Sequence, residues 1–183
     1  ITLLARAKSL IGIAYYSRSE HDAAIENYQT SYELYHRAGD VRGEATAHNL
    51  IANVYFNLGR WGDADFHYQQ ALKIFVRIGD LYNQAVTHNN LGGIAKNQGR
   101  FEDAIQFYED ALQLIEKIDG SVWIMGMFHM NFGATYVHQG DAILGLQHLE
   151  SSQEFFTEAQ SKDFLPEVWR YMAEANILMG AFD

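Results

Sequence analysis

Histidine is the residue type in this chain best suited to bind a metal ion, and its positions follow a pattern. The chain has eight histidines among 183 residues. His48, His88 and His129 are 40 and 41 residues apart, and His67 and His148 also share one repeated position. Equivalent residues on successive packed helices are about 10 Å or more apart, whereas zinc needs ligand nitrogens about 2 Å from one ion. The spacing predicts no metal site and no cofactor, and it favours half-buried rings at these positions.

The acidic and hydroxyl residues show no arrangement typical of an active site. Acidic pairs and an acidic ridge fall on expected outer helix faces, where solvation explains them: Glu102-Asp103, Glu109-Asp110, and Glu150, Glu154 and Glu158. No serine stands in a G-x-S-x-G context, and the chain has no cysteine and no phosphate-binding loop of P-loop spacing. The sequence therefore predicts that this chain is not an enzyme.

The residues that could do chemistry are embedded in a pattern that repeats about every 40 residues. Its members recur at that spacing: Gly39 and Gly79, Gly59 and Gly99, Ala64 and Ala104, Tyr68 and Tyr108, and Ala71 and Ala111. The register extends back to Tyr28 and, after one inserted residue that follows Ile118, forward to Gly140. A fixed period in this range is typical of a solenoid of stacked units.

Apolar spacing and glycines predict the helices. His48, Ile51, Ala52 and Tyr55 form one helical face, which Gly59 ends. Helices are expected near residues 2–17, 21–37, 41–58, 61–77, 81–98, 101–117, 121–139, 142–159 and 163–179. The expected fold is all-α, with about four and a half antiparallel helix pairs in a single domain of residues 1–183. Its units are expected near residues 1–38, 39–78, 79–118, 119–160 and, incomplete, 161–183.

Composition and charge exclude several classes of function. The formal net charge is -10, and nucleic-acid affinity rests on Lys and Arg, so no nucleic-acid partner is expected. No segment has the roughly 18 to 20 consecutive apolar residues of a membrane span. The absence of cysteine fits a reducing compartment, which favours a cytoplasmic location. Because the chain begins and ends inside the repeat pattern, we expect it to be a piece of a longer protein.

The repeated residues resemble the tetratricopeptide repeat family, and the resemblance covers nearly the whole chain. The matching residues are Leu91, Gly92, Ala95, Gly99, Ala104, Tyr108 and Ala111. The period exceeds the usual 34 residues and is similar to the long variant of Pins-type adaptors, kinesin light chains and bacterial signalling proteins. The resemblance implies a right-handed superhelix of helix pairs that serves as a scaffold for protein binding.

In this family the first helix of each pair lines a concave surface, so the resemblance implies which residues face a partner. The implied floor consists of five triplets: Ser9, Ile13 and Tyr16; Asn49, Asn53 and Phe56; Asn89, Gly93 and Lys96; Met130, Ala134 and Val137; and Arg170, Glu174 and Ile177. Within it, the expected groove residues are Tyr16, Asn49, Asn53, Phe56, Asn89, Lys96, Met130 and Arg170. Primary amides both donate and accept hydrogen bonds, so the asparagines are expected to hold the backbone of an extended or helical segment. The alternative is that they are only solvated side chains.

The resemblance leaves the partner open. Chaperone-binding members capture a carboxylate with cations and asparagines; here Asn53 and Asn90 match, but Asn49, Met127 and Asn131 stand where cations are expected. A carboxylate clamp needs charge-assisted bonds, so no binding to chaperone tails is expected. The favoured function is an adaptor that binds another protein or a peptide. The alternative is a sensor module of a signalling protein or transcription regulator that responds to a peptide or small effector, and self-association through the solenoid ends is a third option.

Overall fold

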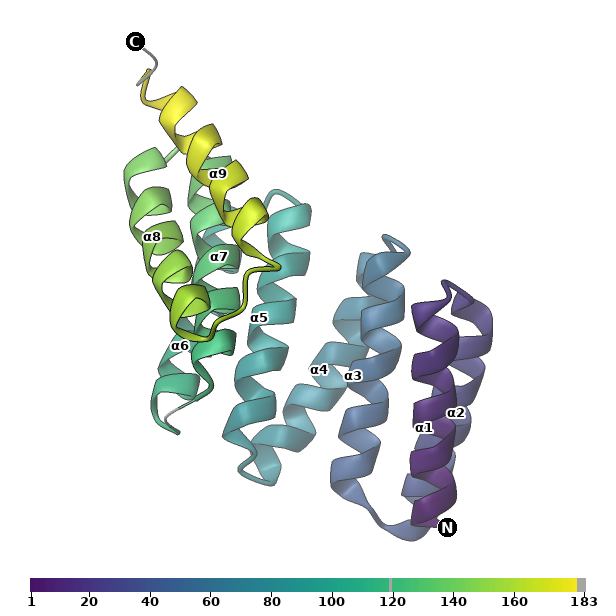
Figure 1. The fold of residues 1–183 in the computed structure, drawn as a ribbon. Coiled ribbons are helices and arrows are strands. Elements are labelled where there is room, and N and C mark those ends of the chain that lie inside the picture. The colour runs from purple at the N-terminus through teal and green to yellow at the C-terminus, as the bar shows by residue number, and fades with distance from the viewer. Residues whose placement is uncertain (119, 181–183) are drawn as a thin grey trace. The chain divides into compact units, whose positions relative to one another are not determined.

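The computed structural model describes residues 1–118 and 120–180, and these residues form nine α-helices and no strand. The helices are α1 (Thr2–Ser17), α2 (His21–Ala38), α3 (Val41–Asn57), α4 (Trp61–Arg77), α5 (Leu81–Asn97), α6 (Phe101–Glu116), α7 (Val122–Gln139), α8 (Ala142–Glu158) and α9 (Leu165–Leu178). The predicted all-α class is confirmed (Figure 1). Every predicted boundary lies within two residues of the observed one.

The helices group into two compact units, residues 1–87 and 88–183, and the division falls inside α5. In the first unit α1 packs against α2, α2 against α3, and α3 against α4. In the second unit α6 packs against α7, α7 against α8, and α9 lies against both α7 and α8 (Figure 1). Each unit is therefore built from consecutive helices joined by short turns.

The Gly-Asp pairs between hairpins end one helix and begin the next. Gly39 adopts φ 67°, a left-handed conformation that closes α2 without a side-chain clash. Asp40 then caps α3, because its Oδ1 accepts a hydrogen bond from the Gly43 amide at 2.9 Å. Ser19 occupies the position that glycine holds in later hairpins, with φ 61°, and this conformation costs a residue with a side chain about 1–2 kcal/mol.

Small residues on one helix receive a large side chain from the next, and this explains the repeated glycines and tyrosines. A Cβ atom on Gly12 would lie 2.5 Å from the ring of Tyr28, and one on Gly92 would lie 2.7 Å from the ring of Tyr108. Both tyrosines are almost completely buried. The repeat pattern is therefore a packing pattern, because neither ring would fit beside a larger residue.

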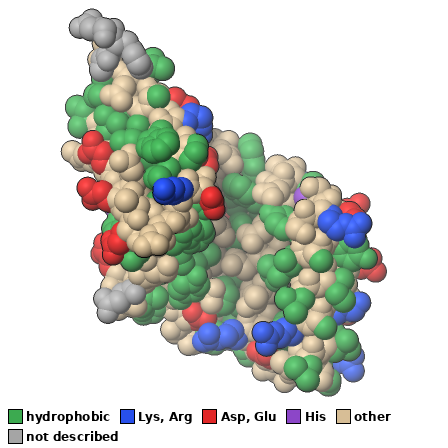
Figure 2. All heavy atoms as spheres, in the orientation of Figure 1, with side chains coloured by type: hydrophobic (Ala, Val, Ile, Leu, Met, Phe, Trp, Pro, Cys, Tyr) green, Lys and Arg blue, Asp and Glu red, His purple; other side chains and the backbone are tan. Residues whose placement is uncertain are grey.

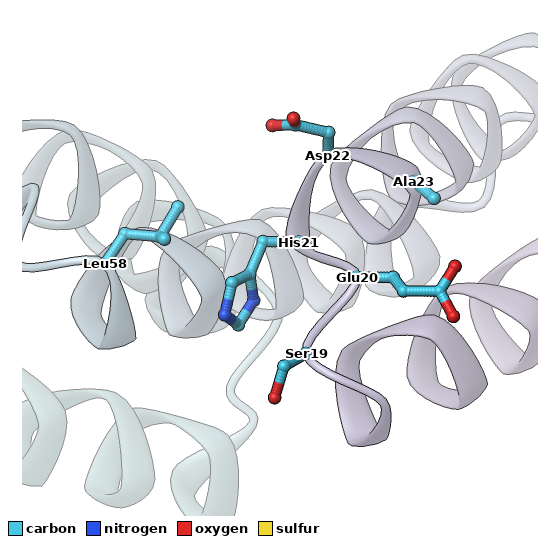
Figure 3. A pocket seen from close by; sticks show the side chains of 6 residues that line it. All are labelled: Ser19, Glu20, His21, Asp22, Ala23 and Leu58. Atoms are coloured by element: carbon cyan, nitrogen blue, oxygen red, sulfur yellow. The ribbon is translucent and has the colours of Figure 1, made fainter.

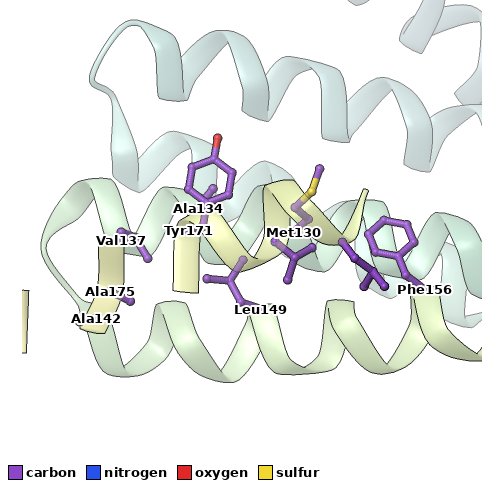
Figure 4. Packing of buried hydrophobic residues seen from close by; sticks show 10 residues of the cluster. Met130, Ala134, Val137, Ala142, Leu149, Phe156, Tyr171 and Ala175 are labelled. Atoms are coloured by element: carbon purple, nitrogen blue, oxygen red, sulfur yellow. The ribbon is translucent and has the colours of Figure 1, made fainter. Parts of the chain in front are cut away.

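The second unit has a hydrophobic cluster in which α9 covers α7 and α8 (Figure 4). Leu149 and Phe156 of α8 are fully buried there, and Tyr171 of α9 is 8% exposed. Along residues 1–118 and 120–180, none of the helices has both the length and the apolar character needed to cross a membrane.

The close approach of α4 to α3 predicts a strong effect of enlarging Ala64, which is fully buried. Gly145 holds the equivalent position in the fourth hairpin, which consists of α7 and α8. A Cβ atom there would lie 2.6 Å from Val137. Ala64→Leu should overpack this crossing and lower the free energy of unfolding by about 1–3 kcal/mol, measured by urea denaturation.

The control for Ala64→Leu is Gly62→Ala on the same helix. Among the described residues nothing lies within 4 Å of a Cβ atom at Gly62, so this change should leave stability unaltered or raise it by about 0.4–1 kcal/mol. Equal stability of Ala64→Leu and the wild type would show that the packing at this crossing is looser than described.

Candidate peptide-binding surface

Three asparagines form one stripe on α3. Asn49, Asn53 and Asn57 are spaced by four residues, so their side chains project from one face of the helix. The first two were predicted from the sequence. Asn57 was not, although continuing the same spacing by one turn would have identified it. We call these three residues the asparagine stripe.

Two members of the stripe are held by tyrosine hydroxyls. The Tyr68 hydroxyl donates a hydrogen bond to Asn53 Oδ1 at 2.5 Å, and Asn57 Nδ2 donates one to the hydroxyl oxygen of Tyr16. Tyr68 is 2% exposed, so its bond orients Asn53 with the amide nitrogen away from the core. The Tyr16 hydroxyl keeps its own proton available, and burial raises its pKa above the usual value, so it remains a donor at neutral pH.

The stripe carries unused hydrogen-bonding groups. Asn49 Oδ1 is buried and, within the part of the chain that the structure describes, has no hydrogen-bond partner. A buried polar atom without a partner costs about 1–3 kcal/mol. Because the atom is out of contact with solvent, the Asn49 amide must rotate before a ligand can donate a hydrogen bond to this oxygen.

Apolar and aromatic side chains accompany the stripe in the first unit. Phe56 and Tyr16 are half-buried. Ile13 is 43% exposed. Ser9, expected on the same surface, is buried instead and exchanges a hydrogen bond with Ser31 at 2.7 Å, so it joins α1 to α2.

A pocket of about 460 Å³ opens beside the α1–α2 turn (Figure 3). Its lining comes from that turn, the start of α2 and the end of α3: Ser19, Glu20, His21, Asp22, Ala23 and Leu58. The ring of His21 lies 6.1 Å from the ring of Tyr16 in an edge-to-face arrangement. The pocket therefore adjoins the Tyr16 end of the asparagine stripe. The sequence feature that could have indicated this pocket is Ser19, which stands where later hairpins have a glycine.

The second unit has its own group of amides. Asn131 Nδ2 donates a hydrogen bond to Asn89 Oδ1 at 3.0 Å, which ties α5 to α7. Asn89 Nδ2 lies 3.5 Å from Asn90 Oδ1. The acceptor oxygen of Asn89 is thus used within the unit, unlike that of Asn49.

Met130 does not lie on an accessible surface. It is 4% exposed and belongs to the hydrophobic cluster that α9 covers (Figure 4). Its expected neighbours Ala134 and Val137 are buried in the same cluster. We therefore remove Met130 from the candidate surface: α9 occupies the face of α7 that was expected to meet a partner.

Lys96 and Arg170 differ in their surroundings. Arg170 pairs with Glu174 at 2.6 Å and with Glu167 at 3.5 Å, and its guanidinium lies 3.9 Å from the centre of the Tyr171 ring. Two carboxylates therefore balance its charge. Burial lowers the pKa of Lys96, while Glu167 acts in the opposite direction. No carboxylate of the described residues lies within ion-pairing distance of its ammonium group, so Lys96 offers the less neutralised charge of the two.

The histidines are closer than the repeat spacing suggested, because the relevant pairs lie within one hairpin. His48 Nδ1 is 2.9 Å from His67 Nδ1, and His129 Nδ1 is 3.1 Å from His148 Nδ1. The prediction compared equivalent positions in successive hairpins and overlooked contacts between the two helices of one hairpin. Even so, no cluster of three or more candidate metal ligands occurs among residues 1–118 and 120–180.

The Tyr68–Asn53 bond can be tested by stability. Tyr68→Phe removes the hydroxyl donor and leaves Asn53 Oδ1 without it, so the free energy of unfolding should fall by about 0.5–1.5 kcal/mol in urea denaturation. Asn53→Ala in the Tyr68→Phe background removes the remaining partner and should lower the free energy of unfolding only slightly further. Additive losses for the two changes would mean that the residues do not interact.

Comparison with known proteins agrees with this architecture. Two family models described as "Tetratricopeptide repeat" match residues 3–77 and 85–117, which together exceed half of the chain. A search of curated protein sequences found no match.

Several solved structures share the fold. BtubC (BKLC) from P. vanneervenii is 22% identical with a TM-score of 0.76, over 86% of this chain and 65% of that one. Aspartyl phosphate phosphatase F from Bacillus subtilis is 16% identical with a TM-score of 0.87, over 98% of this chain and 48% of that one. The Rap conjugation gene regulator of the plasmid pLS20, in complex with the Phr* peptide, is 18% identical with a TM-score of 0.79, over 100% of this chain and 48% of that one.

This chain spans between 48% and 65% of the length of those structures, and at these identities the likeness concerns the fold alone. The family matches, the helix pairs and the small residues that receive a tyrosine agree with one another. The chain belongs to the tetratricopeptide repeat family.

Proposed function

We propose that this chain is a protein-interaction module that binds a segment of another protein along the asparagine stripe of α3. The unused hydrogen-bonding capacity of the stripe carries the proposal, above all the buried and unpartnered Asn49 Oδ1. The amide nitrogen of Asn53 adds a donor, because the Tyr68 hydroxyl occupies its oxygen. A stripe that offers both donors and acceptors suits a peptide backbone, which also carries both.

The spacing of the stripe favours an extended ligand. Side chains four residues apart on a helix are separated by about 6.0 Å along its axis, and every second residue of an extended chain is separated by about 6.6 Å. The stripe can therefore meet alternate residues of an extended segment that runs along α3. A helical segment uses its backbone groups internally, so it has few left for these amides.

Rings and a pocket beside the stripe would provide selectivity. Tyr16 and Phe56 are half-buried and offer apolar surface to ligand side chains, and aromatic residues are enriched among energetically important interface positions. The pocket lined by His21 and Leu58 adjoins Tyr16 and can hold one side chain. In the second unit we propose Lys96 and Arg170 as candidate partner-binding residues, with Lys96 attracting an acidic group. Asn89, expected on the same surface, is buried and its oxygen accepts a hydrogen bond from Asn131, so we remove it from the candidate surface.

We also propose that the chain has no catalytic role, that it is located in the cytoplasm and that it does not bind nucleic acid. The net charge of -10 supports the last point. Lys and Arg side chains are also scattered among acidic ones on the face shown in Figure 2. We further propose that the two units belong to one repeat domain.

The test starts from peptides selected from a displayed random library against the wild-type chain. Asn49→Ala removes an acceptor that has no internal partner, so it should weaken binding by about two- to tenfold, with little loss of stability. Adding Asn53→Ala and Tyr68→Phe together should bring the total loss to about five- to a hundredfold. Isothermal titration calorimetry measures both effects.

Two controls separate this surface from others. Glu150→Gln with Glu154→Gln alters exposed charges on α8 and should scarcely change the affinity. Methylating alternate backbone nitrogens of the peptide should weaken binding to the wild type and have a smaller effect on the asparagine variants. Unchanged affinity in the asparagine variants, together with a loss in the α8 control, would place binding on the outer face.

A second candidate function is a sensor module within a larger regulatory protein. It is favoured by the similar structure whose title names a conjugation gene regulator in complex with a peptide. In such a module, the selected peptide should change the distance between labels placed in the two units. An unchanged distance at saturating peptide would favour the adaptor.

A further inference from the structure

Each unit contains a pair of histidines that joins the two helices of one hairpin. His48 of α3 faces His67 of α4, and His129 of α7 faces His148 of α8, with Nδ1 to Nδ1 distances of 2.9 Å and 3.1 Å. These are the second and fourth hairpins of the repeat. Both distances are those of a hydrogen bond.

The rings of each pair meet end to end. Their centres are 5.1 Å and 5.2 Å apart, which exceeds the nitrogen separation by roughly two ring radii. The two Nδ1 atoms therefore point at each other, and one must carry a proton while the other offers its lone pair. The other two arrangements, with a proton on both Nδ1 atoms or on neither, are excluded at neutral pH because two protons or two lone pairs would repel each other.

The pair tolerates one added proton and resists the second. The donor ring can be protonated at Nε2 and keep its Nδ1–H···Nδ1 bond, which then becomes charge-assisted. The acceptor ring already carries its proton at Nε2, so its next proton must go to Nδ1. That step replaces the hydrogen bond with two facing N–H groups on two cations.

Aromatic neighbours surround both pairs and limit solvation of a second charge. In the first unit the Tyr32 ring lies 4.9 Å from His48 and the Tyr55 ring 5.6 Å from His67. Burial and the charge of His67 lower the pKa of His48 to about 4, and Glu44 partly opposes them. Burial also lowers the pKa of His67, with Asp63 opposing.

The pair in the second unit lies among aromatic rings, and no carboxylate of the described residues opposes the lowering of its pKa values there. Phe132 is 4.1 Å from His148, Tyr136 is 5.7 Å from it, and Phe155 is 5.4 Å from His129. Burial and then His148 lower the pKa of His129 to about 4, and burial lowers that of His148. Along the part of the chain that the structure describes, no carboxylate opposes either shift.

The other hairpins lack such a pair. In the third, Phe107 stands where a second histidine would be, 5.9 Å from His88, and Asp110 lies 3.7 Å from His88 Nδ1. In the first, Lys8 and Asn27 occupy the two positions. Phenylalanine at the second position is therefore compatible with the fold.

We propose that His48–His67 and His129–His148 are acid-labile clasps, which hold the second and fourth hairpins closed near neutral pH and open when the second ring of each pair is protonated. The device is independent of the proposed binding function. Histidines in the unfolded chain take up protons near pH 6.5, whereas the clasps resist. The clasps therefore stabilise the fold most above pH 6.5, and this contribution is lost as the pH falls from 6.5 toward 4.

The test combines histidine NMR with urea unfolding between pH 7.5 and 4.5. In the wild type, at least one ring of each pair should remain unprotonated at pH 5, and the neutral pairs should show one Nδ1–H tautomer each. His67→Phe with His148→Phe copies the third hairpin. This variant should show a shallower loss of unfolding free energy with falling pH than the wild type, because fewer protons are taken up on unfolding.

The control is His36→Gln, which removes a histidine outside both pairs whose side chain is 68% exposed and lies 3.4 Å from Glu44. Its pH dependence should stay closer to that of the wild type than the pH dependence of the phenylalanine variant does. Comparing variants also cancels the titration of carboxylates common to all of them. The proposal is overturned if the paired rings titrate near pH 6.5, the value of an unperturbed histidine, or if the phenylalanine variant keeps the wild-type pH dependence. Should that variant fail to fold, the NMR titration of the wild type decides alone.

Discussion

The structure depends on how closely the two helices of a hairpin approach each other. Gly12 and Gly92 leave no room for even a methyl group beside Tyr28 and Tyr108, and Gly133 does the same for Leu149 in the fourth hairpin, where a Cβ atom would lie 2.7 Å from that side chain. In these three hairpins the large side chain comes from the second helix, and the close contact fixes how the two helices cross. That crossing determines which face of the first helix remains outside the core, and the asparagine stripe lies on such a face.

Much of the fold could be predicted because local and long-range requirements coincide in this chain. A left-handed glycine such as Gly39 ends a helix for a local steric reason, and Asp40 begins the next helix through a bond to an amide three residues away. Such signals act over a few residues and repeat with the period, so one hairpin predicts the next. Ser19 shows that the glycine rule has an exception: it adopts the same conformation as the repeated glycines at an energetic cost.

The candidate surface was predicted less completely, because it depends on contacts between helices far apart in the sequence. Asn49 and Asn53 followed from helix spacing, but the bond between Asn57 and Tyr16 joins residues from two hairpins, and no local pattern reveals it. Met130 was expected to be accessible, since the repeat pattern alone does not say that α9 covers α7. The histidine pairs were overlooked for a related reason: comparing equivalent positions measures distances between hairpins and not within one.

The bond between Tyr68 and Asn53 has a consequence for ligand polarity. A free primary amide can rotate and exchange its donor and acceptor, so a stripe of free asparagines would accept a peptide in either chain direction. Asn53 is not free, because the buried Tyr68 hydroxyl occupies its oxygen at 2.5 Å. If a peptide binds there as proposed, the centre of the stripe would present a fixed donor and would need a carbonyl oxygen opposite it. A ligand that places a carbonyl at that point in only one of its two orientations would bind in one direction, and the direction would be set by a tyrosine that the ligand never touches.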